Sequence, residues 1–92
     1  MPRGLSERQR TIIALFDGSR RRLVYGEGPL TTSELMEELV EAGDLPKGIR
    51  RDIARFTIRR ACRSLERRGH LASKPVIVDD TGGTAIEWRA SK

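Results

Sequence analysis

The chain contains one cysteine, Cys62, and one histidine, His70, among its 92 residues. A single cysteine cannot form an intramolecular disulfide, and these two residues cannot supply the four ligands of a structural zinc site. A chain without disulfides is typical of a reducing, intracellular compartment. The scarcity of these residues therefore predicts a fold held by packing alone, with no metal and no cofactor.

Aromatic residues and long apolar runs are also scarce. The chain holds four aromatic side chains, too few for the base-stacking platform of proteins that bind RNA or single-stranded DNA. No stretch approaches the roughly 18 apolar residues of a membrane-spanning helix, and the N-terminus lacks the apolar run of a signal peptide. We therefore expect a soluble cytoplasmic protein without a membrane partner, associated with the nucleoid if it binds DNA.

No arrangement of residues typical of an enzyme is present. The sequence contains no Ser-His-Asp set, no phosphate-cradling glycine loop and no paired-acid motif. Cys62 lies on an apolar stripe between Ala61 and Leu65, which favours a small core residue over a nucleophile. We predict that the protein is not an enzyme, and no small-molecule ligand is evident from its residues.

The chain does have positive charge, and that charge is concentrated in one segment. Residues 47–75 carry ten Lys and Arg against two Asp and Glu, whereas residues 1–46 carry six against eight and residues 76–92 two against three. The segment 47–75 therefore holds a net charge of +8 in a chain of net charge +5. Such a field attracts and orients a polyanion, so the distribution favours a nucleic-acid partner.

Two helices are predicted from their starting signals. Ser6 and Gln9 have the spacing of a capping box, and so do Thr31 and Glu34. Gly18 supplies a C-terminal stop for the first of these helices. The first helix is therefore expected from about residue 6 and the second from Thr31.

Residues 44–69 resemble one long helix, but their periodicity indicates two. Two apolar stripes lie on faces more than a right angle apart: Ile58, Ala61, Cys62 and Leu65 on one, and Ile49, Ile53 and Phe56 on the other. Because one straight helix cannot bury both stripes against one core, we predict a break near Arg55–Thr57. The break separates a short helix at about 46–54 from a third main helix at about 57–68.

The C-terminal segment predicts a β-hairpin with strands at 75–78 and 84–88, and a further short strand is expected at 23–25. A two-residue hairpin turn would place apolar and charged residues on the same face, so a loop of odd length is expected. The expected cross-strand pairs are Val78 with Ile86, and Val76 with Trp88. This register makes Trp88 a core residue rather than one that stacks on a base.

The order helix, short strand, helix, helix and hairpin resembles the winged helix-turn-helix family of transcription regulators. The clearest residues are Thr57-Ile-Arg-Arg-Ala-Cys-Arg-Ser-Leu-Glu-Arg-Arg-Gly-His-Leu71, similar to the family's third-helix pattern T-V-x-x-A-L-x-x-L-E-x-x-G-L. The segment Thr31-Thr-Ser-Glu-Leu35 is similar to the start of the helix before it. The resemblance implies a small regulator that binds double-stranded DNA sequence-specifically through the helix at about 57–68.

The fold class that follows is α+β, in one domain over residues 1–92 with a core at about 6–89. It comprises three main helices, a short extra helix and a C-terminal two-stranded β-hairpin wing. Two features depart from the family pattern. Seventeen residues separate Leu39 from Thr57, more than the usual turn, and the expected wing tip carries Asp79 and Asp80, where DNA-binding wings often place Arg or Lys.

The polar face of the expected third helix supplies the candidate DNA contacts, because a major groove about 12 Å wide admits one helix. Residues near the start of that helix reach base edges, and later ones reach phosphates. We expect Thr57, Arg60 and Ser64 nearest the bases and Arg63 and Arg67 on phosphates. Further candidates are Arg55 and Arg59 beside this helix, Arg50 and Arg51 on the short helix, and Lys74 and Arg89 at the base of the wing.

Other interpretations stay open. The basic face is alternatively a solvated charged surface, or a protein–protein interaction surface that docks an acidic partner, and exposed Ile49, Ile53 and Phe56 would favour the latter. The loop Arg20–Arg22 is expected to be solvated, with a phosphate clamp as the alternative. Homodimerisation is plausible because regulators commonly read two half-sites, and the residues to examine for an interface are Leu15, Leu23 and Tyr25.

Overall fold

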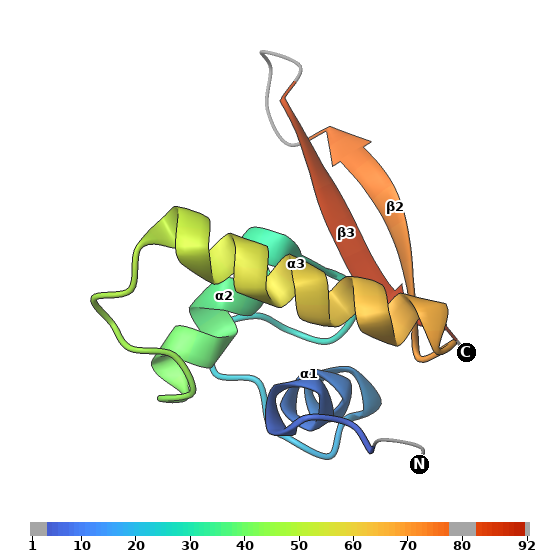
Figure 1. The fold of residues 1–92 in the computed structure, drawn as a ribbon, viewed down its shortest axis with the longest axis horizontal. Coiled ribbons are helices and arrows are strands. Elements are labelled where there is room, and N and C mark those ends of the chain that lie inside the picture. The colour runs from blue at the N-terminus through green and yellow to red at the C-terminus, as the bar shows by residue number, and fades with distance from the viewer. Residues whose placement is uncertain (1–3, 78–82, 92) are drawn as a thin grey trace.

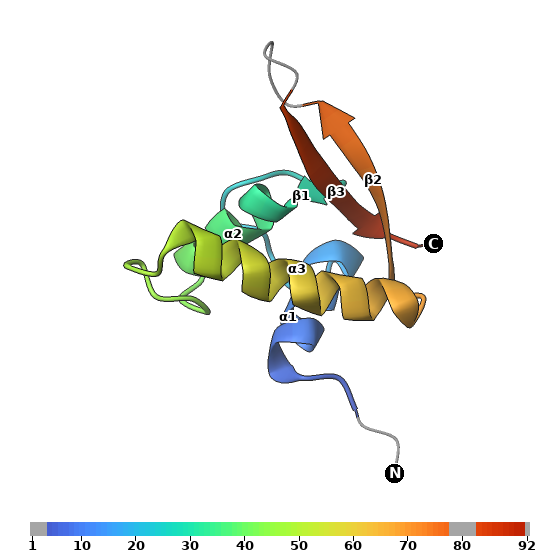
Figure 2. The ribbon, with the colours of Figure 1, turned by 45° about the horizontal axis from the view of Figure 1, so that its top comes forward.

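The computed structural model describes residues 4–77 and 83–91. Its elements are α1 (Glu7–Asp17), β1 (Leu30–Thr31), α2 (Thr32–Glu41), α3 (Arg51–Arg67), β2 (Leu71–Ile77) and β3 (Thr84–Ala90). The three strands form an antiparallel sheet with the spatial order β1-β3-β2. The fold of these residues is therefore α+β, with α3 in front of α2 and above α1, and the hairpin β2–β3 standing beside it (Figures 1 and 2).

Both predicted capping boxes are present. The backbone N–H of Gln9 donates to the Ser6 hydroxyl over 3.2 Å, and the Ser6 N–H donates back to the Gln9 side chain over 2.9 Å. Thr31 and Glu34 exchange the equivalent pair of bonds over 3.2 and 2.8 Å. Each box satisfies backbone N–H groups that a helix start leaves without partners, so α1 and α2 begin where the sequence predicts.

The third helix differs from its prediction. α3 is one unbroken helix of 17 residues, so the predicted break near Arg55–Thr57 and the short extra helix at 46–54 are wrong. The third helix accordingly begins at Arg51 rather than near residue 57. The second apolar stripe is therefore not carried by a separate helix within the described residues.

The reason for the unbroken helix is a small residue, Ala54. It extends the apolar stripe of α3 by one turn toward the N-terminus. The buried stripe is Ala54, Ile58, Cys62 and Leu65, each 0% exposed. Two residues of the competing stripe stay outside the core, since Ile53 is 48% exposed and Phe56 is 66% exposed. The third, Ile49, precedes α3 and packs partly buried against the core. One straight helix therefore buries one stripe and leaves Ile53 and Phe56 in solvent.

The sheet has three strands rather than the predicted two. The added strand β1 pairs Leu30 with Trp88 and Thr31 with Glu87. The short strand expected at 23–25 is absent, because the backbone N–H groups of these residues donate to a carboxylate instead of to a neighbouring strand. That acceptor is the side chain of Glu38 on α2, and the three donor–acceptor distances are 2.8, 3.1 and 2.7 Å.

The hairpin register also differs from its prediction. Trp88 lies opposite Ser73 rather than Val76, and Ile86 lies opposite Pro75; Val78, the partner predicted for Ile86, is outside the described residues. The strand β2 begins at Leu71, four residues earlier than predicted. The actual register places buried Leu71 and Trp88 on the same face of the sheet, as burial of the apolar face requires.

Trp88 joins the sheet to the helices, and its prediction as a core residue is confirmed. It is 0% exposed, and its indole N–H donates to the hydroxyl of Thr32 over 2.9 Å. The guanidinium carbon of Arg63 lies 5.1 Å from the centre of the Trp88 ring, within the range of a cation–π contact. One side chain from β3 therefore contacts the start of α2 and the C-terminal half of α3.

Glu38 organises the loop between α1 and β1. Its side chain is buried, the residue being 1% exposed, and it accepts the three backbone N–H groups described above. A buried carboxylate is stable only where donors replace the lost water. The loop supplies those donors, and in return Glu38 satisfies N–H groups that have no strand partner.

We expect Glu38→Ala to lower the free energy of unfolding by about 3 kcal/mol, because hydrogen bonds to a charged group each contribute roughly 1.5–3 kcal/mol. Urea denaturation followed by the fluorescence of the one tryptophan measures this change. Glu41→Ala removes an exposed carboxylate from the same helix and is expected to change stability by less than about 0.5 kcal/mol. Equal effects of the two substitutions would contradict the role assigned to Glu38.

Candidate nucleic-acid interface

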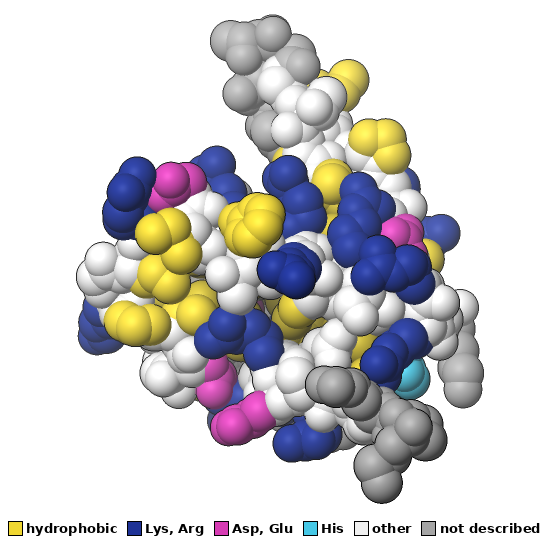
Figure 3. Space-filling view, in the orientation of Figure 1, with side chains coloured by type: hydrophobic (Ala, Val, Ile, Leu, Met, Phe, Trp, Pro, Cys, Tyr) yellow, Lys and Arg dark blue, Asp and Glu magenta, His cyan; other side chains and the backbone are white. Residues whose placement is uncertain are grey.

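The outward face of α3 is basic because its opposite face is apolar. Burial of the Ala54–Leu65 stripe turns Arg60 and Arg67 to solvent, and both residues are exposed. Figure 3, drawn in the orientation of Figure 1, shows dark blue side chains gathered over the middle and C-terminal part of α3. Apolar side chains gather at its other end, over the N-terminal part of the helix and the segment before it.

A groove of about 450 Å³ lies between this face and the start of α1. Its lining residues are Ser6, Arg8 and Gln9 from α1 and its cap, and Thr57, Arg60, Ala61, Ser64 and Arg67 from α3. Four of the predicted contacts, Thr57, Arg60, Ser64 and Arg67, are thus brought together. The three residues from α1 were missed because the sequence shows their capping pattern but not that the start of α1 lies beside α3.

The arginine side chains of the groove make no ion pair or hydrogen bond with other described residues, although the charge of Arg67 acts on the neighbouring Glu66 carboxylate. Within residues 4–77 and 83–91, the guanidinium groups of Arg8, Arg60 and Arg67 form no ion pair and no hydrogen bond. Arg55 and Arg59, also predicted as contacts, are exposed and equally without an ion pair in that part of the chain. Three guanidinium groups around one hollow therefore repel one another, and an external polyanion relieves that repulsion.

Thr57 is partly committed to its own helix. Its hydroxyl donates to the backbone carbonyl of Ile53 over 2.9 Å, which leaves the hydroxyl oxygen available only as an acceptor. Arg60 and Ser64 follow it at the spacing of one helical turn each. Of the three predicted base contacts, Arg60 and Ser64 keep their donors available.

Arg63 links α3 to the hairpin. Its guanidinium donates to Glu66 over 2.9 Å and to the Ser73 hydroxyl over 3.4 Å, and it covers Trp88. Hydrogen bonds from Ser73 and from Arg63 lower the pKa of the Glu66 carboxyl below its ordinary value. The structure therefore places this predicted phosphate contact in an internal network, with part of the guanidinium still at the surface.

The remaining candidates lie away from the groove. Arg50 pairs with Asp52 over 3.2 Å, and Arg51 lines a different hollow beside α2. Lys74 pairs with Glu87 across the hairpin over 3.7 Å. Arg89 is exposed on the same outer face of the sheet as this pair, two residues after Glu87. The structure does not bring these four residues to the α3 groove.

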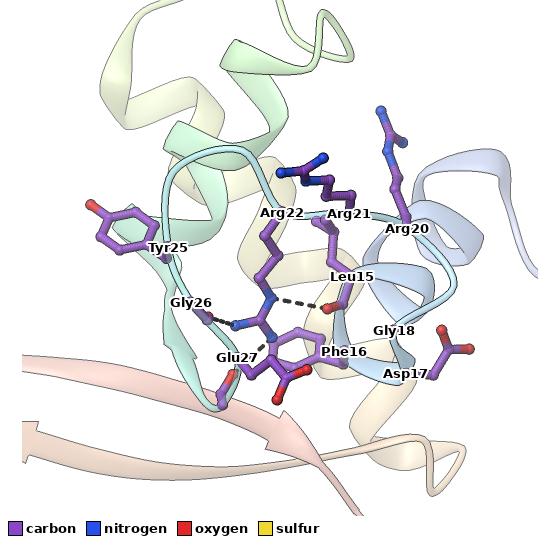
Figure 4. Close-up of a pocket in the computed structure, with 11 residues that line it drawn as sticks. Leu15, Phe16, Asp17, Gly18, Arg20, Arg21, Arg22, Tyr25, Gly26 and Glu27 are labelled. Carbon is purple, nitrogen blue, oxygen red and sulfur yellow. Dashed lines mark hydrogen bonds between the residues drawn. The ribbon is translucent and has the colours of Figure 1, made fainter.

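The basic loop after α1 is used for folding. Arg22 donates to the backbone carbonyls of Leu15, Gly26 and Gly28, and its guanidinium lies 5.4 Å from the centre of the Phe16 ring. Figure 4 shows Arg22 crossing the hollow between α1 and the loop, whereas Arg20 and Arg21 point away from it.

The neighbour Arg20 also has a partner, because it forms an ion pair of 2.6 Å with Asp44. Of the three loop arginines, two are therefore bound to groups within the chain. These bonds favour a structural role for the loop over the phosphate clamp.

Comparison with protein-family models, curated proteins and solved structures finds no match to this chain. Function is therefore inferred from the geometry of the site. Among the described residues, no helix combines the length and apolar character needed to cross a bilayer. The same residues contain no group of three or more His, Cys, Asp or Glu side chains that could hold a metal ion.

Cys62 lies behind the groove in the core, and burial raises the pKa of its thiol to about 12. We expect native protein at pH 8 to react with a thiol reagent far more slowly than denatured protein, because the thiolate is the reactive form. The unfolded thiol ionises near its ordinary pKa of 9.0, so stability falls as the pH rises above about 9. Rapid labelling of the native protein at pH 8 would contradict this burial.

Proposed function

We propose that this protein binds double-stranded DNA sequence-specifically, as a small transcription regulator with α3 in the major groove. The observation that carries the proposal is the groove where Arg8, Arg60 and Arg67 lie without internal partners in the described chain. α1 and α3 are both anchored in the core through residues that are 0% exposed, such as Ile12 and Ile58. A rigid basic face of this kind suits the backbone of a duplex.

The architecture supports a winged helix-turn-helix arrangement. The elements follow the order helix, strand, helix, helix and hairpin, as in the family that the sequence resembles. In that arrangement α2 and α3 are the DNA-binding helix pair, and the hairpin β2–β3 is the wing. The residues of the acidic wing tip, Asp79 and Asp80, lie outside the described part of the chain.

The earlier start of α3 changes which side chains lead into the DNA. At 100° per residue, Phe56 and Ile53 lie on the same outward side of α3 as Arg60. They are nearer to the N-terminus, and this end of a recognition helix contacts base edges. We place Arg60 and Ser64 on bases, with Phe56 against a thymine methyl group, a contact that phenylalanine makes in major grooves. Arg67 and Arg8 then lie on phosphates.

Salt dependence tests the proposal directly. If about six phosphates are contacted, the logarithm of duplex affinity falls against the logarithm of salt concentration with a slope near −5. We expect Arg67→Ala to make that slope about one unit shallower and to weaken all duplexes alike. The matched control is Arg21→Ala, which removes an exposed arginine outside the groove and leaves the slope unchanged. Absence of duplex binding at low salt would refute the proposal.

Arg60→Ala separates base contact from phosphate contact in the same titrations. It is expected to weaken binding to a selected duplex by about 1–3 kcal/mol and to affect scrambled duplexes less, because a base contact is lost. Equal losses on selected and scrambled DNA would show that Arg60 contacts only the backbone.

Exposed Ile53 and Phe56 favour a second candidate function, a protein-interaction surface that docks an acidic partner. The two side chains are 48% and 66% exposed, and exposed apolar patches with aromatic residues are common at protein interfaces. In this alternative the arginines steer the acidic partner and Phe56 supplies the buried contact.

Phe56→Ala distinguishes the two functions. If Phe56 contacts a thymine methyl, the substitution weakens binding to the selected duplex by about 1 kcal/mol, the free energy of one buried methyl group. Replacing that thymine by uracil, which lacks the methyl, then gives the unaltered protein the same loss. Duplex affinity unchanged by Phe56→Ala would instead assign the exposed apolar pair to a protein partner.

A further inference from the structure

A second groove, of about 640 Å³, lies on the side of α2 and shares no residue with the α3 groove. Its lining residues are Leu23, Val24, Met36, Glu37, Val40, Glu41, Lys47, Ile49 and Arg51. Leu23 is 59% exposed and Val24 is 46% exposed. Of the three other apolar residues in the lining, Met36 is buried, and Val40 and Ile49 are partly buried against the core. Two exposed aliphatic side chains thus lie beside an apolar floor that continues into the core.

The two edges of this groove carry opposite charges. Glu37 and Glu41 lie on α2, whereas Lys47 lies on the segment that leads into α3 and Arg51 is the first residue of α3. Among the described residues, none of the four forms an ion pair across the groove. Glu37 accepts a hydrogen bond from the Tyr25 hydroxyl, which orients its carboxylate. The groove therefore has an acidic edge and a basic edge, and each lacks an ionic partner there.

We propose that the α2 groove is the interface of a homodimer, occupied by the same groove of a second copy of this chain. A two-fold axis parallel to the groove places the acidic edge of each copy against the basic edge of the other. Leu23, Val24 and Ile49 of the two copies then form a common apolar centre. The contact closes on itself, as an isologous interface must.

Charge favours a second copy over other occupants. A polyanion is repelled by Glu37 and Glu41, and a strongly basic partner is repelled by Lys47 and Arg51. A surface with equal numbers of both charges on opposite edges is complementary to itself after a two-fold rotation. The proposed dimer does not depend on DNA binding, and its groove shares no residue with the α3 groove.

Leu23→Asp tests the apolar centre. The side chain is exposed, and the substitution places a charge inside the proposed interface. Because the backbone N–H of Leu23 donates to Glu38, circular dichroism first checks that the variant is folded. The unaltered protein is expected to shift from monomer to dimer with rising concentration in light scattering or sedimentation, without DNA. Leu23→Asp is expected to raise the dimer dissociation constant about tenfold or more. The matched control Ile77→Asp alters an aliphatic residue that is 76% exposed on the hairpin, and it leaves the constant unchanged.

A charge exchange tests the two-fold arrangement. Glu41→Lys and Lys47→Glu should each weaken self-association, because each places like charges on facing edges. Mixing the two variants should restore a mixed dimer, in which the more basic groove faces the more acidic one. Circular dichroism confirms that each variant is folded.

Three results would overturn the interface: a monomer at all concentrations, a dimer that Leu23→Asp leaves intact, or two dissociated variants that do not associate when mixed. Because these measurements contain no DNA, each of these results leaves the proposed DNA binding standing. Loss of duplex binding by Arg60→Ala and Arg67→Ala leaves the dimer standing in the same way.

Discussion

Burial of one apolar stripe along α3 is the constraint on which the rest of the structure depends. Ala54, Ile58, Cys62 and Leu65 are fully buried, and each large aliphatic side chain among them contributes about 1.5–3 kcal/mol. Because a straight helix can bury only one such stripe, this choice sets the rotation of α3 about its axis. That rotation turns Arg60 and Arg67 outward and leaves Ile53 and Phe56 in solvent. The basic groove and the exposed apolar pair are therefore two consequences of the same packing.

Local features of the fold could be predicted from the sequence, because their causes lie within a few residues. The two capping boxes each link residues three positions apart and occur as expected. The third helix shows the limit of this reasoning. The large residues Ile53 and Phe56 predict a break in this helix, whereas the buried stripe continues through the small residue Ala54. Burial depends on what packs against a position, and a small side chain can be buried more completely than a large one.

Non-local features could not be predicted, since they depend on partners distant in the chain. Residues 23–25 are of types that are typical of a strand. Their backbone N–H groups nevertheless donate to the side chain of Glu38 on a later helix. The hairpin register is set by Leu71 and Trp88 meeting the core together, which no turn rule contains. The same limit applies to the site. The sequence gives Thr57, Arg60, Ser64 and Arg67 from helical spacing, but Arg8 joins them only because α1 packs beside α3.

The arginines fall into two groups according to their partners. Some are bound within the chain and stabilise the fold, and others are free to bind a ligand. A guanidinium removed from water needs acceptors, and the arginines at junctions between elements have them. Arg22 binds three loop carbonyls, Arg20 binds Asp44, and Arg63 binds Glu66 while covering Trp88. Arg60 and Arg67 have no such acceptors within the described chain, although they lie on the same helix as Arg63. The amino-acid composition does not distinguish these two groups of arginines. Their position relative to the buried stripe decides which are satisfied internally, and the unsatisfied ones form the surface that an external anion completes.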